Sequence, residues 1–306
     1  GCDYCHGITD KCDACHTRHK FTAAEARRPE ACMSCHMGYD HPDAESYSES
    51  KMGYIYHMEG EHWDWEKPLA QIVPGKDYRA PTCQFCHMYQ GEGKFTHTTA
   101  SKGIWRMGTV PPKGVDYQSS LKDYPYGVNL PPLNKKIDIY TPENKKKREL
   151  WIEMCSNCHS PRFARIYLEN MDMLMFEMWK ATDRAQSIMD GLAAADAFDP
   201  PVSERGIYPM GDVIADALGP NLLGEGIYNA FKTTGGKIPV YGPILGVYSV
   251  FMAGENNPSV IENMYTDLWF GDKAFAYKGT AHVQQDISWW YGAARVFQKI
   301  SAMESE

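Results

Sequence analysis

One short pattern, Cys-x-x-Cys-His, contains most of the residues in this 306-residue chain that could do chemistry. A chain with this pattern can bond a haem through two thioethers, and the histidine then serves as an axial ligand to the iron. All ten cysteines belong to such pairs: Cys2/Cys5, Cys12/Cys15, Cys32/Cys35, Cys83/Cys86 and Cys155/Cys158. The histidines that follow the pairs are His6, His16, His36, His87 and His159. We therefore predict five haem c groups in this chain.

Zinc sites or disulfides are the alternative use of Cys-x-x-Cys pairs. With 11 histidines in 306 residues, a histidine after all five pairs has chance odds on the order of one in ten million. Cysteines at i and i+3 and a histidine at i+4 also share one face of a helical turn, where a flat macrocycle can lie. The pattern therefore favours haem. Because haem is attached covalently outside the cytoplasm, it also predicts a periplasmic or equivalent compartment.

The histidines outside the motifs are candidates for the second axial position of the irons. An electron-carrying haem commonly has two histidine ligands, whereas a catalytic haem keeps one face open. His19 lies three residues after His16 and is expected on the same helical face. The predicted distal ligands are His19, His57, His62, His97 and His282. The alternative for each is an ordinary surface or hydrogen-bonded histidine.

A sixth free histidine, His41, directly follows Asp40 and is followed by Pro42. The proline disfavours helical geometry at His41 and places the pair at a turn with a restricted backbone. A carboxylate and an imidazole together can accept and pass protons near neutral pH. If the pair overhangs an open iron face, it suits a reaction that moves protons and electrons together. A capping role or an indirect supporting role is the alternative.

The elements that must position these groups are mainly helices. We expect a haem-packed region over residues 1–159 and a helical region over 160–306 that forms an oligomeric bundle. Thr141 and Pro142 predict the start of a helix that ends in the last haem motif. A longer helix is predicted to follow from Pro161.

The expected packing face of that longer helix is a heptad-type seam. Its residues are Phe163, Tyr167, Met171, Leu174, Met178, Ala181, Ala185, Ile188 and Leu192. A lone helix cannot bury such a seam, so a partner is required, and the expected partner is the segment 258–300. Its predicted apolar face comprises Ile261, Met264, Leu268, Phe275, Val283, Trp290, Ala294 and Phe297.

Charge and hydropathy exclude two classes of partner. The formal net charge of -8 gives no reason to expect nucleic acid. The most apolar run, residues 238–254, is too short and too broken by proline and glycine to span a bilayer. No secretory signal opens the sequence. We therefore expect a soluble chain without a transmembrane segment.

Longer stretches of the sequence resemble the octahaem hydroxylamine oxidoreductase family. The resemblance is carried by the five motifs at their intervals, by "CHTRHKF", "MGYDHPDAESYSESKMGYIYH" and "SSLKDYPYG", and by the helical C-terminal part. It covers essentially the whole chain, which looks like the C-terminal portion of such a protein. Members carry eight haems, so five in this chain implies a missing amino-terminal portion with three.

The resemblance implies specific roles. The haem of Cys2, Cys5 and His6 would be catalytic, with Asp40 and His41 as its distal acid-base pair. The other four haems would have two histidine ligands and carry electrons. In oxidising members a tyrosine from a neighbouring subunit is bonded to the catalytic macrocycle. Our choice by distance from the distal pair is Tyr241, followed in order by Tyr248 and Tyr291.

The implied reaction is that of a hydroxylamine dehydrogenase, which oxidises hydroxylamine to nitric oxide or nitrite. The implied partners are two further copies in a homotrimer, a small nitrogen compound and a periplasmic electron-acceptor cytochrome c. In an anammox organism the compartment would be the anammoxosome.

Three alternatives stay open. A close relative, hydrazine dehydrogenase, has the same architecture. A reductive enzyme acting on nitrite or hydroxylamine is expected if no tyrosine cross-link forms. The third alternative is a non-enzymatic electron-transfer cytochrome.

Overall fold

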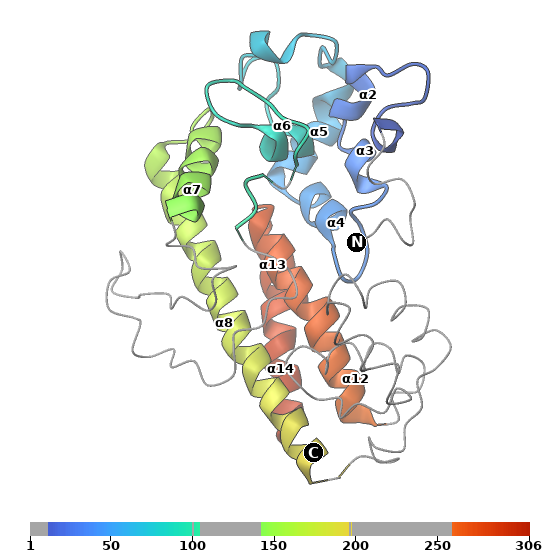
Figure 1. Cartoon of the computed structure of the whole chain (residues 1–306), viewed down its shortest axis with the longest axis vertical. Coiled ribbons are helices and arrows are strands. Elements are labelled where there is room, and N and C mark those ends of the chain that lie inside the picture. Colours follow the sequence, from blue (N-terminus) through green and yellow to red (C-terminus); the bar gives the residue numbers. More distant parts are fainter. Residues whose placement is uncertain (1–11, 100, 105–141, 196, 198–258) are drawn as a thin grey trace, which may run out of the picture.

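The structure, a computed structural model, describes residues 12–99, 101–104, 142–195, 197 and 259–306. These residues fold as helices, turns and loops, and apart from two isolated bridges they contain no β-structure. The prediction of a mainly α chain is confirmed. Figure 1 shows the short helices from the N-terminal part of the sequence gathered at one end of longer helices. None of the described helices combines the length and the apolar character needed to cross a membrane.

We call residues 12–104 and 142–159 the haem half, because they carry the described motifs. Its first helices are short: α2 (Ala23–Arg27), α3 (Glu30–Met33), α4 (Asp43–Ser48), α5 (Lys51–Glu59) and α6 (Cys83–Met88). Single 3-10 turns lie at Cys12–Ala14, Gly60–His62 and Leu69–Gln71. Packed aromatic rings form the main core of this part, namely Tyr47, Tyr56, Trp63, Trp65 and Tyr78.

The two helices predicted in the middle of the chain are present. Helix α7 (Pro142–Cys155) begins at the predicted proline and ends in the last haem motif. Thr141, its predicted N-cap, lies outside the described residues. Helix α8 (Pro161–Ala194) runs for 34 residues, and α7 lies beside its first turns (Figure 1).

We call residues 161–195 and 259–306 the helical half. After α8 it contains two rods joined by a turn. The first rod is α12 (Val260–Thr266), a π-helical segment η6 (Asp267–Asp272) and α13 (Lys273–Ala281). The second is a π-helical segment η7 (Ile287–Ala293) followed by α14 (Ala294–Met303).

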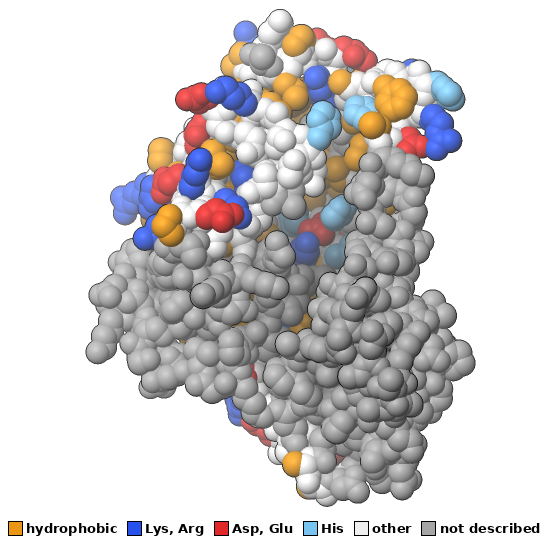
Figure 2. Space-filling view, viewed as in Figure 1, with side chains coloured by type: hydrophobic (Ala, Val, Ile, Leu, Met, Phe, Trp, Pro, Cys, Tyr) orange, Lys and Arg blue, Asp and Glu red, His pale blue; other side chains and the backbone are white. Residues whose placement is uncertain are grey.

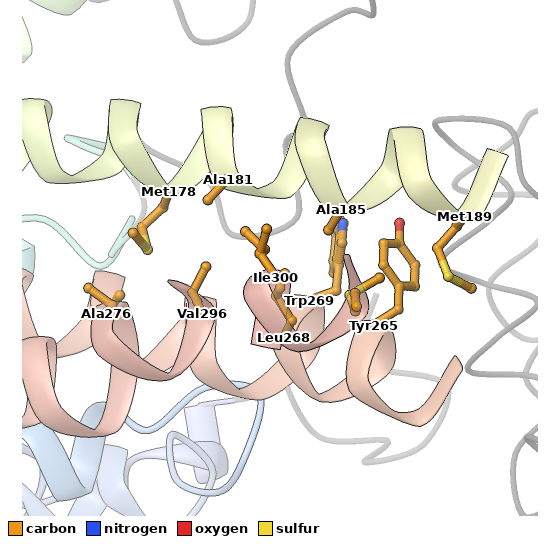
Figure 3. Close-up of a cluster of buried hydrophobic side chains, with 12 residues drawn as sticks. Met178, Ala181, Ala185, Met189, Tyr265, Leu268, Trp269, Ala276, Val296 and Ile300 are labelled. Carbon is orange, nitrogen blue, oxygen red and sulfur yellow. The ribbon is translucent and has the colours of Figure 1, made fainter. Parts of the chain in front are cut away.

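The core of the helical half lies between α8 and these two rods, as predicted (Figure 3). The α8 side of the core consists of Met178, Ala181, Ala185 and Met189. The facing side chains include Tyr265, Leu268, Trp269, Ala276, Ala293, Val296, Ile300 and Met303. Three close-packed helices bury these groups almost completely.

Part of the predicted packing is wrong. Phe163 is 47% exposed and stacks on His159 instead of extending the α8 seam. In the C-terminal segment Val283, Trp290 and Phe297 are exposed. Val283 is exposed because it lies in the turn between the two rods, with a φ of 64°. Trp290 and Phe297 are exposed because each π-helical turn holds an extra residue and rotates the face that follows it. A strict helical period therefore assigns the wrong residues to the core.

Candidate functional site

Each described haem motif is wound into one helical turn. The backbone amide of the histidine donates to the carbonyl of the first cysteine in three of them, at distances of 2.9 to 3.0 Å. These pairs are His16–Cys12, His36–Cys32 and His159–Cys155. The fourth motif lies inside α6. Both cysteines and the histidine thus share one face of a turn, which is the arrangement that haem attachment requires.

The described residues do not support the alternatives of a zinc site or of disulfide bonds at the Cys-x-x-Cys pairs. The described cysteines form no disulfide. Within the described ranges there is also no cluster of three or more His, Cys, Asp or Glu side chains that could hold a metal ion by themselves.

Consecutive motifs are neighbours in space. Cys15 interacts electrostatically with Cys32, and the side chain of Cys32 contacts that of Cys83. Cys86 interacts in turn with Cys155. Haems attached at these positions would follow one another closely, as a path for electrons requires.

Two motif histidines are oriented for iron binding. Nδ1 of His16 lies 3.1 Å from the carbonyl oxygen of Thr22, and Nδ1 of His36 lies 3.6 Å from Oδ2 of Asp43. The Thr22 carbonyl fixes the proton of His16 at Nδ1 and leaves its Nε2 for a metal, and the Asp43 carboxylate faces Nδ1 of His36 from a longer distance. His87 is exposed, and its ring lies edge-on to the ring of Trp151 with 5.6 Å between the ring centroids. These observations fit haem at the motifs.

The predicted distal histidines have different surroundings. His19, His57, His62 and His97 are exposed, and histidines are visible over the haem half in Figure 2. His19 has a φ of 70° and lies in a turn, so it does not continue the helical face of His16 as predicted.

His282 is the distal candidate with the most defined position. Its side chain is 18% exposed, and Nδ1 lies 2.8 Å from the carbonyl oxygen of Lys278. Burial lowers the pKa of His282. Nδ1 therefore donates to the Lys278 carbonyl, and Nε2 faces the carboxylate of Asp43 at 3.7 Å.

Asp40 and His41 form a hydrogen-bonded pair. Nδ1 of His41 lies 2.5 Å from Oδ1 of Asp40, and Nε2 lies 2.9 Å from the carbonyl oxygen of Cys35. Both partners are acceptors, so only the doubly protonated imidazole donates at both nitrogens. The Asp40 and His41 side chains are 49% and 36% exposed. The pair can therefore hold a proton and still be reached by a small molecule.

The pair sits in a short closed loop, residues 36–44, between α3 and α4. The amide of Ala44 donates to the carbonyl of His36 at 2.8 Å and closes the loop. Gly38 has a φ of 109°, a conformation that glycine adopts at low cost. The amide of Gly38 donates to Glu45 at 2.9 Å. These contacts restrain the backbone on which the Asp40–His41 pair is carried.

Two side chains anchor this loop on the helical half. The hydroxyl of Tyr39 donates to Oδ1 of Asp267 at 3.1 Å, and its ring covers Gly271 of η6. Asp43 pairs with Lys278 of α13 at 2.9 Å. One anchor precedes the Asp40–His41 pair and the other follows it. A part of the chain without haem motifs thus positions the proposed acid-base groups.

Residues 1–122 and 128–199 match the family described as "Seven times multi-haem cytochrome CxxCH". The chain belongs to that family. Its cofactor is therefore haem c, and the chain is a multihaem, oxidoreductase-like cytochrome.

Individual relatives are more specific. A Kuenenia stuttgartiensis protein named "Probable nitrite reductase-hydroxylamine oxidoreductase fusion protein" is 51% identical to this multihaem cytochrome over 306 residues, which is 36% of that protein's length. A solved chain of a "Kuenenia stuttgartiensis reducing HAO-like protein complex" is 55% identical, with a TM-score of 0.81 over 100% of this chain and 60% of the other.

A more distant solved structure, a "Hypothetical multiheme protein", is 20% identical with a TM-score of 0.59. It covers 96% of this multihaem cytochrome and 57% of its own chain, and it shows the shared fold alone. All three relatives are thus considerably longer than the present chain.

Several predicted site residues of the multihaem cytochrome lie outside the described residues. These are Cys2, Cys5, His6, Tyr241 and Tyr248. Tyr291, the third choice for the cross-link, is described; it is 50% exposed, and the Arg295 guanidinium lies 5.0 Å from its ring centroid. Their predicted roles stay predictions.

Sequence reasoning missed a buried cation between the last two motifs. Lys102 is 1% exposed, and its ammonium lies 4.4 Å from the ring centroid of Trp151. It also donates to the carbonyl of Cys86. Burial lowers the pKa of Lys102 to about 8. No local pattern marks this lysine, because its neighbours come from distant parts of the sequence.

Proposed function

We propose that this multihaem cytochrome reduces a small nitrogen compound, either nitrite or hydroxylamine, at the haem of Cys2, Cys5 and His6. The observation that carries the direction is the 55% identity, over the whole chain, to part of a reducing HAO-like protein complex. The name of the 51% identical relative, which includes a nitrite reductase, supports the substrate class. Because both relatives are longer, the substrate of the whole protein belongs to the proposal.

The hydrogen-bonded His41 suits the proton demand of this reaction. Reducing nitrite to hydroxylamine takes four electrons and five protons and releases one water molecule. A catalyst of that reaction needs a proton donor beside the substrate. When bound at Cys2, Cys5 and His6, the haem would supply an iron site for the substrate and the route by which electrons reach it. His41, held as a donor between Asp40 and the Cys35 carbonyl, would deliver protons, and Asp40 would help to restore them.

The remaining motifs complete the proposal. Haems at the second to fifth motifs would carry electrons to the catalytic haem, each with two histidine ligands. The predicted distal histidines remain candidates for these ligands. We infer a small c-type cytochrome as the electron partner, a compartment outside the cytoplasm, and a homotrimer. The sequential proximity of the described motifs supports the electron path.

Oxidation of hydroxylamine to nitric oxide or nitrite is the second candidate. The words "hydroxylamine oxidoreductase" in the name of the 51% identical relative favour it. The same two residues would then accept protons while electrons leave through the other haems. A tyrosine bond to the catalytic haem, with Tyr241 as first choice, belongs to this candidate only.

Assays of the purified holo-protein in both directions would distinguish the candidates. In one, reduced methyl viologen supplies electrons for nitrite or hydroxylamine under anaerobic conditions. In the other, oxidised cytochrome c accepts electrons from hydroxylamine. We expect oxidation of the reduced methyl viologen together with formation of a more reduced nitrogen product. Turnover only in the second assay would overturn the reductive proposal in favour of oxidation.

A further inference from the structure

A partly buried ion pair lies beside the axial histidine of the third haem motif. The carboxylate of Asp43 is 15% exposed, and the ammonium of Lys278 is 2.9 Å from each of its oxygens. Oδ2 of Asp43 is also 3.6 Å from Nδ1 of His36. On the other side, Oδ1 lies 3.7 Å from Nε2 of His282. One carboxylate thus bridges a lysine and two histidines.

The fold holds this carboxylate in place. Asp43 is the first residue of α4, and Lys278 lies in the last turn of α13. The bond from the Ala44 amide to the His36 carbonyl keeps the start of α4 beside the motif. Gln284 donates to the carbonyl of Glu49 at 2.5 Å and ties the other end of α4 to the helical half. These contacts fix the backbone that carries Asp43 and keep α4 beside α13.

The two charges act on the iron in opposite directions. A carboxylate facing Nδ1 increases the electron donation of an imidazole to its metal and favours the ferric state. A cation at the same place offsets that effect and favours the ferrous state. Partial burial strengthens both effects, because less water screens the charges. The ammonium of Lys278 lies within hydrogen-bonding distance of both carboxylate oxygens, so Asp43 acts as the anion of an ion pair.

We propose that Asp43 and Lys278 are positioning residues that set the reduction potential of the haem bound at Cys32, Cys35 and His36, Asp43 lowering it and Lys278 raising it. The reduction potential of this haem would then depend on the two opposing charges of one partly buried ion pair. The inference goes beyond the proposed reaction. It requires haem at the third motif, but it holds for either direction of catalysis.

Removing one charge at a time tests the proposal. Asp43→Asn and Lys278→Gln are compared in the holo-protein, without substrate, by redox titration followed by electron paramagnetic resonance of the low-spin ferric haems. For one haem component we expect Asp43→Asn to favour reduction by about tenfold at fixed potential, which is about 59 mV for one electron. Lys278→Gln is expected to shift the same component the opposite way. Asp43→Glu and Lys278→Arg keep the charges and should stay near the wild-type potential.

The opposite signs separate tuning from damage. A structural disturbance would move both variants in one direction or move several haems together, and either result would overturn the proposal. No shift in either variant would overturn it as well. Asp286→Asn, at an exposed carboxylate in the helical half, is the control for charge loss elsewhere. If Asp43→Asn fails to assemble with full haem content, the sign of the Lys278→Gln shift still decides. Since no substrate is present, a failure of the proposed reaction would leave this result unchanged.

Discussion

The two halves of the described structure are held together by different kinds of core. In the haem half, helices α2 to α6 contain four to nine residues each, lengths that are not stable alone in water. Their core is a cluster of tyrosine and tryptophan rings. In the helical half, α8 has 34 residues, and methionine, alanine and leucine side chains form much of the core.

This contrast means that the proposed reacting groups lie in the haem half, whereas the helical half helps to position them. The helical half buries its core side chains between its own helices, and this core needs no cofactor. The haem half leaves several motif cysteines exposed, including Cys12, Cys15 and Cys35, and relies on haem and on contacts with its neighbour. The loop that carries Asp40 and His41 belongs to the haem half, but its two anchors reach the helical half.

The largest effect is expected from His41→Gln. This substitution removes the proposed proton donor of the haem half and does not change the helical half. We expect turnover with nitrite or hydroxylamine to fall by about 100-fold or more, because a positioned proton donor typically contributes that much. Haem content and the absorption spectrum should stay at wild-type levels. Steady-state kinetics beside the Asp286→Asn control would measure the change. Turnover within a few-fold of wild type would remove His41 from the proposed mechanism.

The next effect is confined to the helical half. Met178 is completely buried in its core, so Met178→Ala is expected to cost about 2–5 kcal/mol of unfolding free energy. Met58 is 78% exposed, and Met58→Ala is the matched control, with an expected change under about 0.5 kcal/mol. Urea unfolding followed by far-ultraviolet circular dichroism would compare them. Equal effects would contradict the assignment of the core.

A smaller effect is expected at the boundary between the halves. A Cβ at Gly271 would overlap the ring of Tyr39, so Gly271→Ala should cost about 1–3 kcal/mol by overpacking. It should also loosen the loop that carries Asp40. Adding Tyr39→Ala removes the clash, and a double-mutant cycle measures the coupling. Strictly additive unfolding free energies would show that Tyr39 does not dock on η6.

The remaining effect is a gain in stability, of the same size as the loss expected at Gly271. Lys273 is 2% exposed, its ammonium has no hydrogen-bond partner among the residues that the structure describes, and it lies 3.3 Å from the ring centroid of Trp269. Lys273→Met keeps the shape and is expected to raise the unfolding free energy by about 1–3 kcal/mol. Lys94→Met, at a 73% exposed side chain, should change it by less than about 0.5 kcal/mol.

The same lysine gives the wild-type protein a pH dependence. Burial lowers the pKa of Lys273 to about 7, whereas an unfolded lysine has a pKa of about 10.4. Between these values the unfolded chain binds more protons, so this group makes stability rise with pH from about 7 to 10. A plot of unfolding free energy against pH over that range should have a smaller slope for Lys273→Met than for the wild type. An unchanged slope would mean that Lys273 is not buried in its neutral form.

Local features of this structure could be predicted from the sequence. The start of α7 at Pro142, the extent of α8 from Pro161 and the single-turn haem motifs depend on residues close together in the chain. The Asp40–His41 hydrogen bond joins adjacent residues and follows from the turn before Pro42. Short-range physical chemistry determines all of these.

Features made by distant residues could not be predicted. Asp43 and Lys278 are separated by 235 positions, and no pattern near either residue marks the pair. The exposed Trp290 and Phe297 were assigned to the core because a regular helical period was assumed. The π-helical segments that change the period are stabilised by tertiary packing, including the close contact between Gly292 and Ala276.

Mass spectrometry of the haem peptides from the purified holo-protein tests the reductive proposal most directly. We expect the peptide containing Cys2, Cys5 and His6 to carry one haem through two thioethers and no other link. A peptide in which that haem is also joined to a tyrosine, whether Tyr241 or another, would contradict the reductive proposal and point to oxidation of hydroxylamine.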